Sequence, residues 1–444
     1  MTTDRARYTV RPGRKSDAAY LVRLQSSVQL QPMTGGQPHP GVGAWVEGLF
    51  DGHPTVRPDD FLVVENEATG RPVASLVGLR QDWSLAGVRL PVVQVELVGT
   101  APEHRGNGLT ELLFRALHER CAADGVPIQM IEGIPYFYRR LGYDYALAND
   151  GAATVPAASL PIAEPDRSGG STGGLSVRPA TRADAEALAG IDRLLGDGPA
   201  LHCPRDAEVW GYEIAGRQPA DIAGRSVAVL TNGTEMRGYL VHGTRLSTTG
   251  ELMVVAAACQ RPADWPEAAA AMQAYLGQVS REHAAAAGQT FTALRLVLVP
   301  DHPLARLSPP GVPRRPRGWY VRTGDPVGLL ARLRPVLRAR WHAANLRWPE
   351  PTLIIDLYGR AARFEFTDGE LTAVTAVRGT VSPATDPATH AALPPASLLH
   401  LALGYRTLPE VLDAWPDCLL RDRLTEHFLG VGFPAVPVQV WPRN

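Results

Sequence analysis

A glycine-rich turn between an apolar segment and a helix is the part of the sequence best suited to chemistry. The apolar segment ends at Thr100, the turn is Arg105-Gly106-Asn107-Gly108, and Leu109–Ala123 carries apolar residues at spacings of three and four, which predicts an amphipathic helix. Glycine lets a backbone approach a ligand closely, and the N–H groups at a helix start attract anions. Because Arg105 adds a positive charge, the turn is suited to a pyrophosphate group. The other interpretation is a plain turn between a strand and a helix.

A second group of reactive side chains lies in Tyr136–Tyr143, where aromatic residues and arginines surround a short predicted helix that ends at Gly142. A phenol has a pKa of about 10 in solution, so a tyrosine can act as a general acid. The same segment would also suit an aromatic plug of the core at the end of a helix.

Length and composition describe a folded protein with several domains. The chain has 444 residues, and roughly 150 residues per domain predicts about three domains. Its 44 basic and 45 acidic residues leave a net charge of -1, so a nucleic-acid binder that relies on bulk positive charge is not expected. The four cysteines lack the spacing of a metal site or a disulfide framework, and we expect no metal.

The sequence indicates neither a membrane partner nor an export signal. Its first residues are polar and charged, unlike a signal peptide, and no apolar run approaches the roughly 18 residues that a membrane helix needs. We therefore expect a cytoplasmic protein.

Changes in composition divide the chain into three parts. We expect a first domain at 1–165, a linker of small polar residues at 166–174, a second domain at 175–307, a proline-rich crossing at 308–325 and a third domain at 326–444.

The first two domains begin alike. Tyr8–Pro12 and Leu175–Pro179 both end in Val-Arg-Pro and precede an alanine-rich helix, which indicates a tandem pair of related domains. The third part alternates helical and strand-like runs, which predicts a small α+β domain. Its predicted elements are helices at 326–340, 395–402 and 408–414 and strands at 352–357 and 362–366.

The glycine turn and the tyrosine segment together resemble motifs of the GNAT acyltransferase superfamily. Arg105-Gly106-Asn107-Gly108 lies where that family has its coenzyme A pyrophosphate loop, and Tyr138–Tyr143 is similar to its Tyr-x-x-x-Gly-Tyr segment. Over the whole chain the sequence resembles the Eis (enhanced intracellular survival) branch. The second domain lacks a glycine loop after Leu252–Arg261, and Leu398–Leu408 is similar to the leucine-rich helix and Gly-Tyr turn of sterol carrier proteins.

This resemblance implies an α/β (α+β) fold with two tandem GNAT domains, the second degenerate, whose mixed central sheets are flanked by helices, and a C-terminal sterol-carrier-like α+β domain. It also implies acetyl-CoA as co-substrate. By resemblance, Val98 and Thr100 pair with the pantetheine arm through their backbones, and Arg105-Gly106-Asn107-Gly108-Leu109 holds the pyrophosphate.

Three residues are candidates for the proton transfers. By resemblance, Tyr138 is the general acid, and the terminal carboxylate of Asn444 is the base of the Eis branch. Glu96 lies in the strand before the loop, where other GNAT enzymes place a catalytic carboxylate, and it is the alternative base. The tail at 433–444 is rich in apolar residues and proline, which predicts an anchored, extended segment rather than a frayed end.

The expected reaction is acetylation of a primary amine of a small molecule, aminoglycoside-like or lysine-type, by direct transfer in a ternary complex. Aromatic walls from Trp45 and Trp83 with Asp82 nearby would suit a cationic amine, although these aromatic residues would equally suit a core. The alternatives are a GNAT-fold transferase with another donor such as aminoacyl-tRNA, and a non-catalytic ligand-binding or regulatory protein. By resemblance we also expect a homo-oligomer, a trimer or hexamer.

Overall fold

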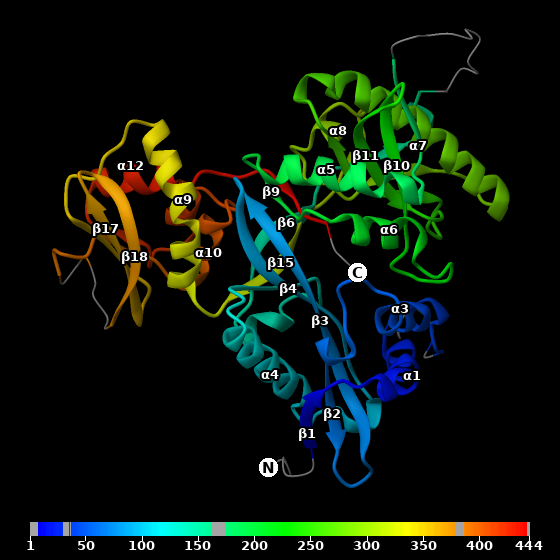
Figure 1. Ribbon diagram of the computed structural model, residues 1–444, viewed down its shortest axis with the longest axis horizontal. Coiled ribbons are helices and arrows are strands. Elements are labelled where there is room, and N and C mark those ends of the chain that lie inside the picture. Colours follow the sequence, from blue (N-terminus) through cyan, green and yellow to red (C-terminus); the bar gives the residue numbers. More distant parts are fainter. Residues whose placement is uncertain are drawn as a thin grey trace.

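The computed structural model describes residues 8–29, 35, 37–161, 174–378, 383 and 386–441. Sheets of nine, seven and five strands organise these residues into three units. Figure 1 shows the units grouped around the long strand β3 (Arg71–Leu85) of the first sheet. The expected α/β class, with mixed sheets flanked by helices, is confirmed.

The first sheet has the strand order β1-β2-β3-β4-β5-β15-β6. Its strands besides β3 are β1 (Tyr8–Pro12), β2 (Phe61–Asn66), β4 (Val88–Thr100), β5 (Ile128–Ile131), β15 (Arg317–Thr323) and β6 (Asp144–Asp150). Strands β4 and β5 are parallel, and the other neighbours in this order are antiparallel. At the far end of β3, β9 (Leu201–His202) pairs with it, and β21 (Val438–Gln439) pairs with β9.

Helices cover both faces of the first sheet. On one face, α4 (Leu109–Ala123) buries Leu113, Phe114 and Leu117 against the strands, and its bounds match the predicted helix. On the other face, α1 (Ala18–Val28) and α3 (Pro40–Phe50) pack against a separate apolar cluster. The stripe of apolar residues on each helix therefore fixes which face it covers.

The second sheet repeats the arrangement of the first. Its order is β14-β7-β13-β12-β11-β10-β8, with β12 (Glu251–Cys259) parallel to β13 (Ala293–Leu296) just as β4 is parallel to β5. The remaining strands are β7 (Ala153–Pro156), β8 (Leu175–Pro179), β10 (Arg225–Asn232), β11 (Glu235–Gly243) and β14 (Val312–Pro313). The helices of this unit are α5 (Ala185–Gly196), α6 (Ala207–Ala215), α7 (Trp265–Ala287) and α8 (Pro303–Arg306).

The repeat extends to one ion pair near the start of each unit. Arg11 donates to both carboxylate oxygens of Asp17 at 2.8 and 3.0 Å, and Arg178 does the same to Asp184 at 2.8 and 2.7 Å. Each aspartate also accepts a backbone N–H three residues before it, at the 3-10 turn that leads into α1 or α5. The two domains were predicted to begin alike because both carry Val-Arg-Pro. The same hydrogen bonds at the start of α1 and α5 extend this likeness to the capping of the first helix.

The two sheets exchange strands. Strand β7, within the expected first domain, pairs with β13 of the second sheet. The expected crossing at 308–325 supplies β14 to the second sheet and then β15 to the first, where β15 lies between β5 and β6. The expected linker at 166–174 lies outside the described residues except for Gly174. The proline-rich crossing thus completes the first sheet instead of only connecting units.

The third unit has the strand order β18-β17-β16-β19-β20. Its elements are α9 (Pro326–Ala343), β16 (Thr352–Asp356), β17 (Arg360–Thr367), β18 (Glu370–Arg378), β19 (Ala391–Ala392), α10 (Pro395–Ala402), α11 (Leu408–Ala414), β20 (Leu419–Leu420) and α12 (Arg423–Gly432). The predicted helices and strands are confirmed, whereas β18 and α12 were not predicted. Its apolar core is aromatic, with the Trp341 and Phe428 rings stacked 4.1 Å apart.

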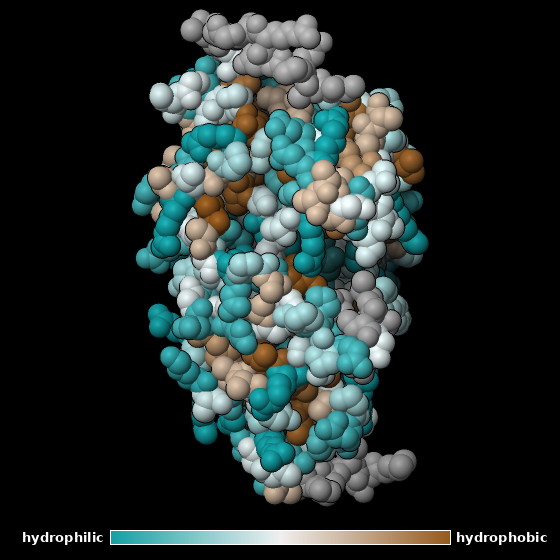
Figure 2. Space-filling model, turned by 90° about the vertical axis from the view of Figure 1, so that its right-hand side faces the viewer, coloured by the Kyte–Doolittle hydropathy of each residue, from teal (hydrophilic) through white to brown (hydrophobic). Residues whose placement is uncertain are grey.

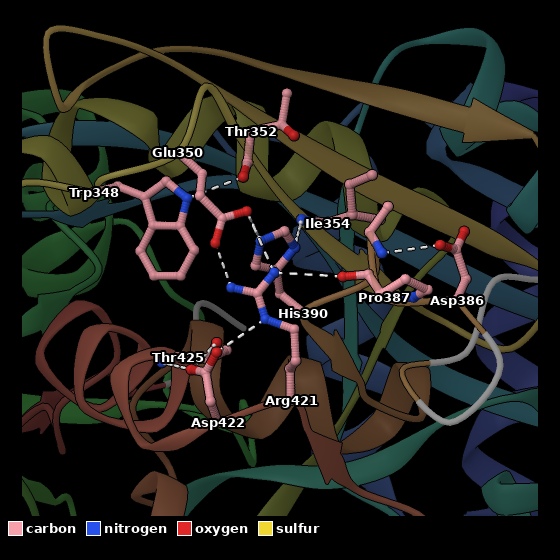
Figure 3. A network of polar contacts seen from close by, with 11 residues as sticks. Trp348, Glu350, Thr352, Ile354, Asp386, Pro387, His390, Arg421, Asp422 and Thr425 are labelled. Atoms are coloured by element: carbon pink, nitrogen blue, oxygen red, sulfur yellow. Dashed lines mark hydrogen bonds and ion pairs between the residues drawn. The ribbon is translucent and has the colours of Figure 1, made fainter.

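A polar network connects residues at or beside β16, β19 and β20 of this third sheet (Figure 3). Nε2 of His390 lies 3.0 Å from the Glu350 carboxylate, and its Nδ1 accepts the Ile354 N–H at 3.1 Å. Arg421 bridges Glu350 and Asp422, with 2.9 Å to the latter. Because these residues come from β16, the segment before β19 and the segment after β20, the network joins three separate pieces of chain.

The first and third units share a core. Trp83 and Trp319 of the first sheet pack with Leu333 of α9 and Leu399 of α10. The described cysteines are free and buried, and the described part of the chain contains no helix long and apolar enough to cross a membrane. Figure 2 shows hydrophobic and hydrophilic residues interspersed over the face formed by the first and second units.

Candidate active site

A gap opens in the first sheet where β4 and β5 diverge. The two strands pair in parallel from Val92 to Gln94, and β5 then ends at Ile131 while β4 continues to Thr100. Within this free stretch Leu97 has a φ of 52°, and the register with β3 shifts beside it. A bulge of this kind bends the strand and leaves part of its backbone without a strand partner. The gap therefore results from the bend in the β4 backbone.

Helix α1 braces the bulge. The Gln25 side chain donates to the Leu97 carbonyl at 2.7 Å, and the Gln29 side chain donates to the Val98 carbonyl at 3.0 Å. Gly99 makes this approach possible, because a Cβ there would lie 2.7 Å from the Gln25 side chain. Sequence analysis missed both glutamines, since a glutamine on a helix looks like a surface residue until its partner is known.

The glycine turn forms the entrance to α4. Gly106 and Gly108 have φ values of 82° and 70°, which favour glycine, and a Cβ at Gly106 would meet no atom within 4 Å. Asn107 closes the turn by donating to the His104 carbonyl at 3.0 Å. Leu109 is the first helical residue and is buried. The N–H groups at the helix start thus lie beside an exposed, open turn, which fits a phosphate group.

Arg105 is exposed beside this turn, and its Nε lies 3.4 Å from the carbonyl of Thr100, the last residue of β4. Its guanidinium is thereby held between the end of the gap and the start of α4. A cation at this point suits an anion that lies over the turn.

Glu96 lies on β4 next to the bulge. Val95 packs on the α4 side of the sheet, so alternation along the strand directs Glu96 toward the side of α1 and α3. Burial raises the pKa of Glu96 to about 8, the nearby Glu132 adds to the rise, and a hydrogen bond of 2.8 Å from Gln94 opposes it. A carboxyl with such a pKa is suited to exchanging protons near neutral pH.

Tyr138 lies on the α4 side of the gap, 5 % exposed, in a cluster of aromatic rings. Its ring contacts Phe114 and Tyr320, with 5.7 Å between centroids in each case. Gly133 leaves room for it, because a Cβ there would lie 2.1 Å from the tyrosine ring. Burial raises the pKa of Tyr138, and the Glu96 charge raises it further. The two predicted proton-transfer groups are therefore electrostatically coupled.

The crossing strand β15 completes this cluster. Tyr320 accepts the Tyr136 N–H at 2.5 Å, and its ring stacks on Tyr145 at 4.0 Å. Tyr136 has a φ of 68°, a strained value for a residue with a side chain, so the bond to Tyr320 stabilises the turn before Tyr138. Sequence analysis missed Tyr320, because no local signal links β15 to the first sheet.

The residues expected to bind the acceptor lie in separate parts of the first unit, one on α3 and two near the end of β3. Trp45 is half-buried on α3, whereas Trp83 is fully buried and packs in the shared core. Asp82 pairs with Arg89 at 2.8 Å. Because Val77 is the β3 partner of Glu96, Trp83 lies six positions, or about 20 Å, along the strand from it.

Asp82 and Trp83 instead border a cavity of about 1000 Å³ between the first and second units. The C-terminal residue Asn444 lies outside the described residues, which end at Trp441. Among the described residues, no three side chains of His, Cys, Asp or Glu gather as a metal site.

Residues 9–146 match the family described as Acetyltransferase (GNAT) domain. A search of the curated proteins found no match to this chain. Several solved structures resemble nearly the whole chain. A GCN5-related N-acetyltransferase from Anabaena variabilis is 15% identical with a TM-score of 0.66, and the alignment covers 98% of this chain and 99% of that one.

The second structure is a conserved protein from Enterococcus faecalis described as a probable N-acyltransferase, 14% identical with a TM-score of 0.67 and coverage of 98% and 99%. The third is Eis1 from Mycobacterium abscessus, 15% identical with a TM-score of 0.60 and coverage of 97% and 98%. At such identities the likeness shows a shared fold. Residues 9–146 form a GNAT acetyltransferase domain, and the protein that carries it is an acyltransferase.

Proposed function

We propose that this protein is an acetyl-CoA-dependent N-acetyltransferase that acetylates a primary amine of a small molecule. The observation that carries the proposal is the β4–β5 gap, which has Glu96 directed to one side, Tyr138 on the other and the glycine turn at its end. An amine acceptor and a thiol leaving group need proton transfer on opposite sides of one carbonyl, and this arrangement supplies both.

Donor binding is assigned to the end of β4 and the turn. The pantetheine arm would lie in the gap against the Val98 and Thr100 backbones, and the pyrophosphate would lie over the turn at 105–109. The Val98 carbonyl already accepts from Gln29, so that part of the backbone has a fixed orientation. The Val98 N–H would donate to the thioester carbonyl and stabilise the negative charge of the transition state.

The transfer itself is a direct one in a ternary complex. The amine nitrogen attacks the thioester carbon, a C–N bond forms, and the carbonyl oxygen gains negative charge. When the intermediate collapses, the C–S bond breaks and the thiolate takes the Tyr138 proton. The proton of the attacking nitrogen passes to a carboxylate, so the products are an amide and free coenzyme A.

The coupling between the two groups gives this sequence an order. While Glu96 is charged, its field raises the pKa of Tyr138 and holds the phenol proton in place. If Glu96 is the base, that field disappears when it accepts the ammonium proton, and Tyr138 becomes a stronger acid. Proton removal from the amine therefore prepares proton donation to the sulfur.

Two carboxylates compete for the role of base. Glu96 has the support of its position and raised pKa. The Asn444 carboxylate has the support of an anchored tail, since Val438 pairs with β9 and Trp441 is buried. An added C-terminal tag, or deletion of the last two residues, distinguishes them: if Asn444 is the base, turnover is lost while acetyl-CoA still binds.

The acceptor is proposed to approach from the side of α1 and α3. Glu96, which is negatively charged once deprotonated, is directed to this side, and Trp45 lies on α3, which suits a cationic amine. An aminoglycoside-like polyamine and a lysine-type amine both have this chemistry. Asp82 and Trp83 would contact an acceptor only in the cavity between the first and second units, and not in the β4–β5 gap.

We further infer that the second unit is a degenerate GNAT domain, the third a sterol-carrier-like domain, and the whole a trimer or hexamer. The parallel pair β12–β13 connected by α7 supports the first assignment, because it repeats the pair β4–β5 connected by α4. A contiguous cluster of buried apolar residues, with the stacked Trp341 and Phe428 rings in it, forms the third unit's core, which favours a structural role there over lipid carriage. Light scattering tests the assembly, and a monomer would contradict it.

A screen of polyamines, aminoglycosides and lysine peptides tests the proposed reaction. Release of free coenzyme A should depend on the amine and disappear in a Tyr138→Phe, Glu96→Gln double variant. A chain that binds acetyl-CoA but acetylates no amine in the screen would contradict an amine acceptor of this class.

A further inference from the structure

The C-terminal segment runs across all three units before the described chain ends. In the third unit, the Val436 N–H donates to the Gly404 carbonyl at 3.1 Å. The Pro437 carbonyl then accepts the Leu201 N–H at 2.8 Å, beside the β9–β21 pair. Trp441 finally packs in the core of the second unit. Figure 1 shows this red segment leaving the third unit and passing β9 toward the second.

The segment ends at the place where the second unit repeats the gap of the first. Strands β12 and β13 pair as far as Val254 and then diverge, as β4 and β5 do after Gln94. Residues 438–441 border the diverging ends at 255–257 and 297–299, which leaves a cavity of only about 30 Å³. After β12 there is no glycine turn: a 3-10 turn at Pro262–Asp264 leads directly into α7.

A buried arginine fixes the last described residue. The Arg205 guanidinium lies 3.2 Å from the centroid of the Trp441 ring, and its NH2 group donates to the Trp441 carbonyl at 3.1 Å. Arg205 is 2 % exposed, so this cation–π contact is shielded from water. Both the ring and the backbone of Trp441 are therefore held by one side chain.

Arg205 is held in turn by Asp192, a fully buried carboxylate. Asp192 accepts the Arg205 N–H at 2.8 Å, the Tyr239 hydroxyl at 2.8 Å and the Trp210 indole N–H at 3.2 Å. His202, which flanks the β9–β21 pair, lies 3.1 Å from the same carboxylate. Groups from β9, β11, α6 and the segment before α6 thus converge on one buried carboxylate, which ties Arg205 to the second unit.

We propose that the second unit serves as a dock for the protein's own C-terminal segment, and that Arg205 is the positioning residue of this dock. A strand pair that diverges without a glycine turn has no place for a pyrophosphate, but it has an apolar edge against which an extended chain can pack. Val438, Val440 and Trp441 occupy that edge.

The dock has a catalytic consequence only if Asn444 is the base, and in that respect it rests on the proposed function. Holding Trp441 limits where the three residues after it can reach. A fixed terminal carboxylate would then be available on each turnover without the entropy cost of ordering a free tail.

Hydrogen exchange in the full chain tests the dock with Arg205→Lys, which keeps the charge but loses the planar stack. Trp441→Leu is the second variant, and Trp441→Phe is the conservative rescue. The matched control is Arg193→Lys, because Arg193 is exposed on α5 and borders the same interdomain cavity as Arg205.

We expect exchange at 436–441 to rise about tenfold in Arg205→Lys and Trp441→Leu, while β10 and β11 stay protected and the control matches the wild type. Unchanged exchange at 436–441 in both variants would overturn the dock. Faster exchange with undiminished turnover would support the dock and contradict only the Asn444 base.

Discussion

The ring of Tyr320 packs against the ring of Tyr138 with 5.7 Å between centroids, although the whole second unit separates them in the sequence. Tyr320 also accepts the Tyr136 N–H. The proposed acid therefore depends on the crossing strand β15 for its position, and the first domain is incomplete at its active site without residues from beyond the second unit.

Replacing Tyr320 tests this dependence. Tyr320→Leu removes the ring that packs on Tyr138, and we expect kcat to fall by up to about 10²-fold, the effect of a displacement near 1 Å. Tyr320→Phe keeps the ring, so we expect a smaller fall in kcat for this variant. Steady-state kinetics with both substrates makes the measurement. Wild-type kcat in Tyr320→Leu would show that Tyr138 needs no support from β15.

Tyr138→Phe should lower kcat by about 10²–10⁴-fold with little change in the KM for acetyl-CoA, because only the proton for the thiolate is lost. The aromatic packing with Phe114 and Tyr320 survives in this variant. Circular dichroism checks the fold. If the phenylalanine enzyme is as active as the wild type, another group protonates the sulfur.

The pH dependence of kcat/KM identifies the base. The pKa of Glu96 is raised to about 8, and a base acts in its deprotonated form. If Glu96 is the base, kcat/KM rises with pH through about 8 and then levels off, and Glu96→Gln removes that limb. A Glu96→Gln enzyme that keeps both rate and pH profile would assign the role to Asn444.

Local patterns in the sequence predicted the glycine turn and the helix that follows it. The turn Arg105-Gly106-Asn107-Gly108 and the helix after it depend on residues adjacent in the chain, so glycine positions and apolar spacing determine both. Helices α9, α10 and α11 of the third unit follow from the same kind of signal. Domain bounds and the roles of individual residues stay predictions.

Long-range pairing could not be predicted in this way. Nothing in the residues of β15 indicates that they lie between β5 and β6, because strand partners are chosen by tertiary contacts. The same holds for Gln25, whose carbonyl partner Leu97 exists only after the bulge forms. Trp83 is fully buried, and its place beside a charged residue in the sequence could not distinguish a binding wall from a core position.

Acid should destabilise the second unit through His302. Its Nε2 lies 3.0 Å from the Ala257 carbonyl and its Nδ1 accepts the Leu304 N–H at 3.2 Å, so the folded protein holds it neutral. Burial lowers the pKa of His302 to about 4. The stability it contributes is present above about pH 6.5, its unfolded pKa, and is lost as the pH falls toward 4, by up to about 3 kcal/mol.

His302→Gln is the matched variant, because it keeps a donor toward Ala257 but does not titrate. Calorimetry at pH 7 and pH 5 should show a smaller loss of Tm for the second unit in the variant than in the wild type. Equal losses would mean that His302 does not contribute to the acid sensitivity.

Titration calorimetry of the full chain with acetyl-CoA tests the central claim, that the glycine turn of the first unit holds the donor. We predict a single site per chain, because only the first unit has the turn. Arg105→Ala should weaken binding by about 1.5–3 kcal/mol, the range for losing a hydrogen bond to a charged group. Arg261→Ala, an exposed arginine after β12 of the second unit, should bind like the wild type. Undiminished affinity in Arg105→Ala, or no binding by the wild-type chain, would contradict the claim.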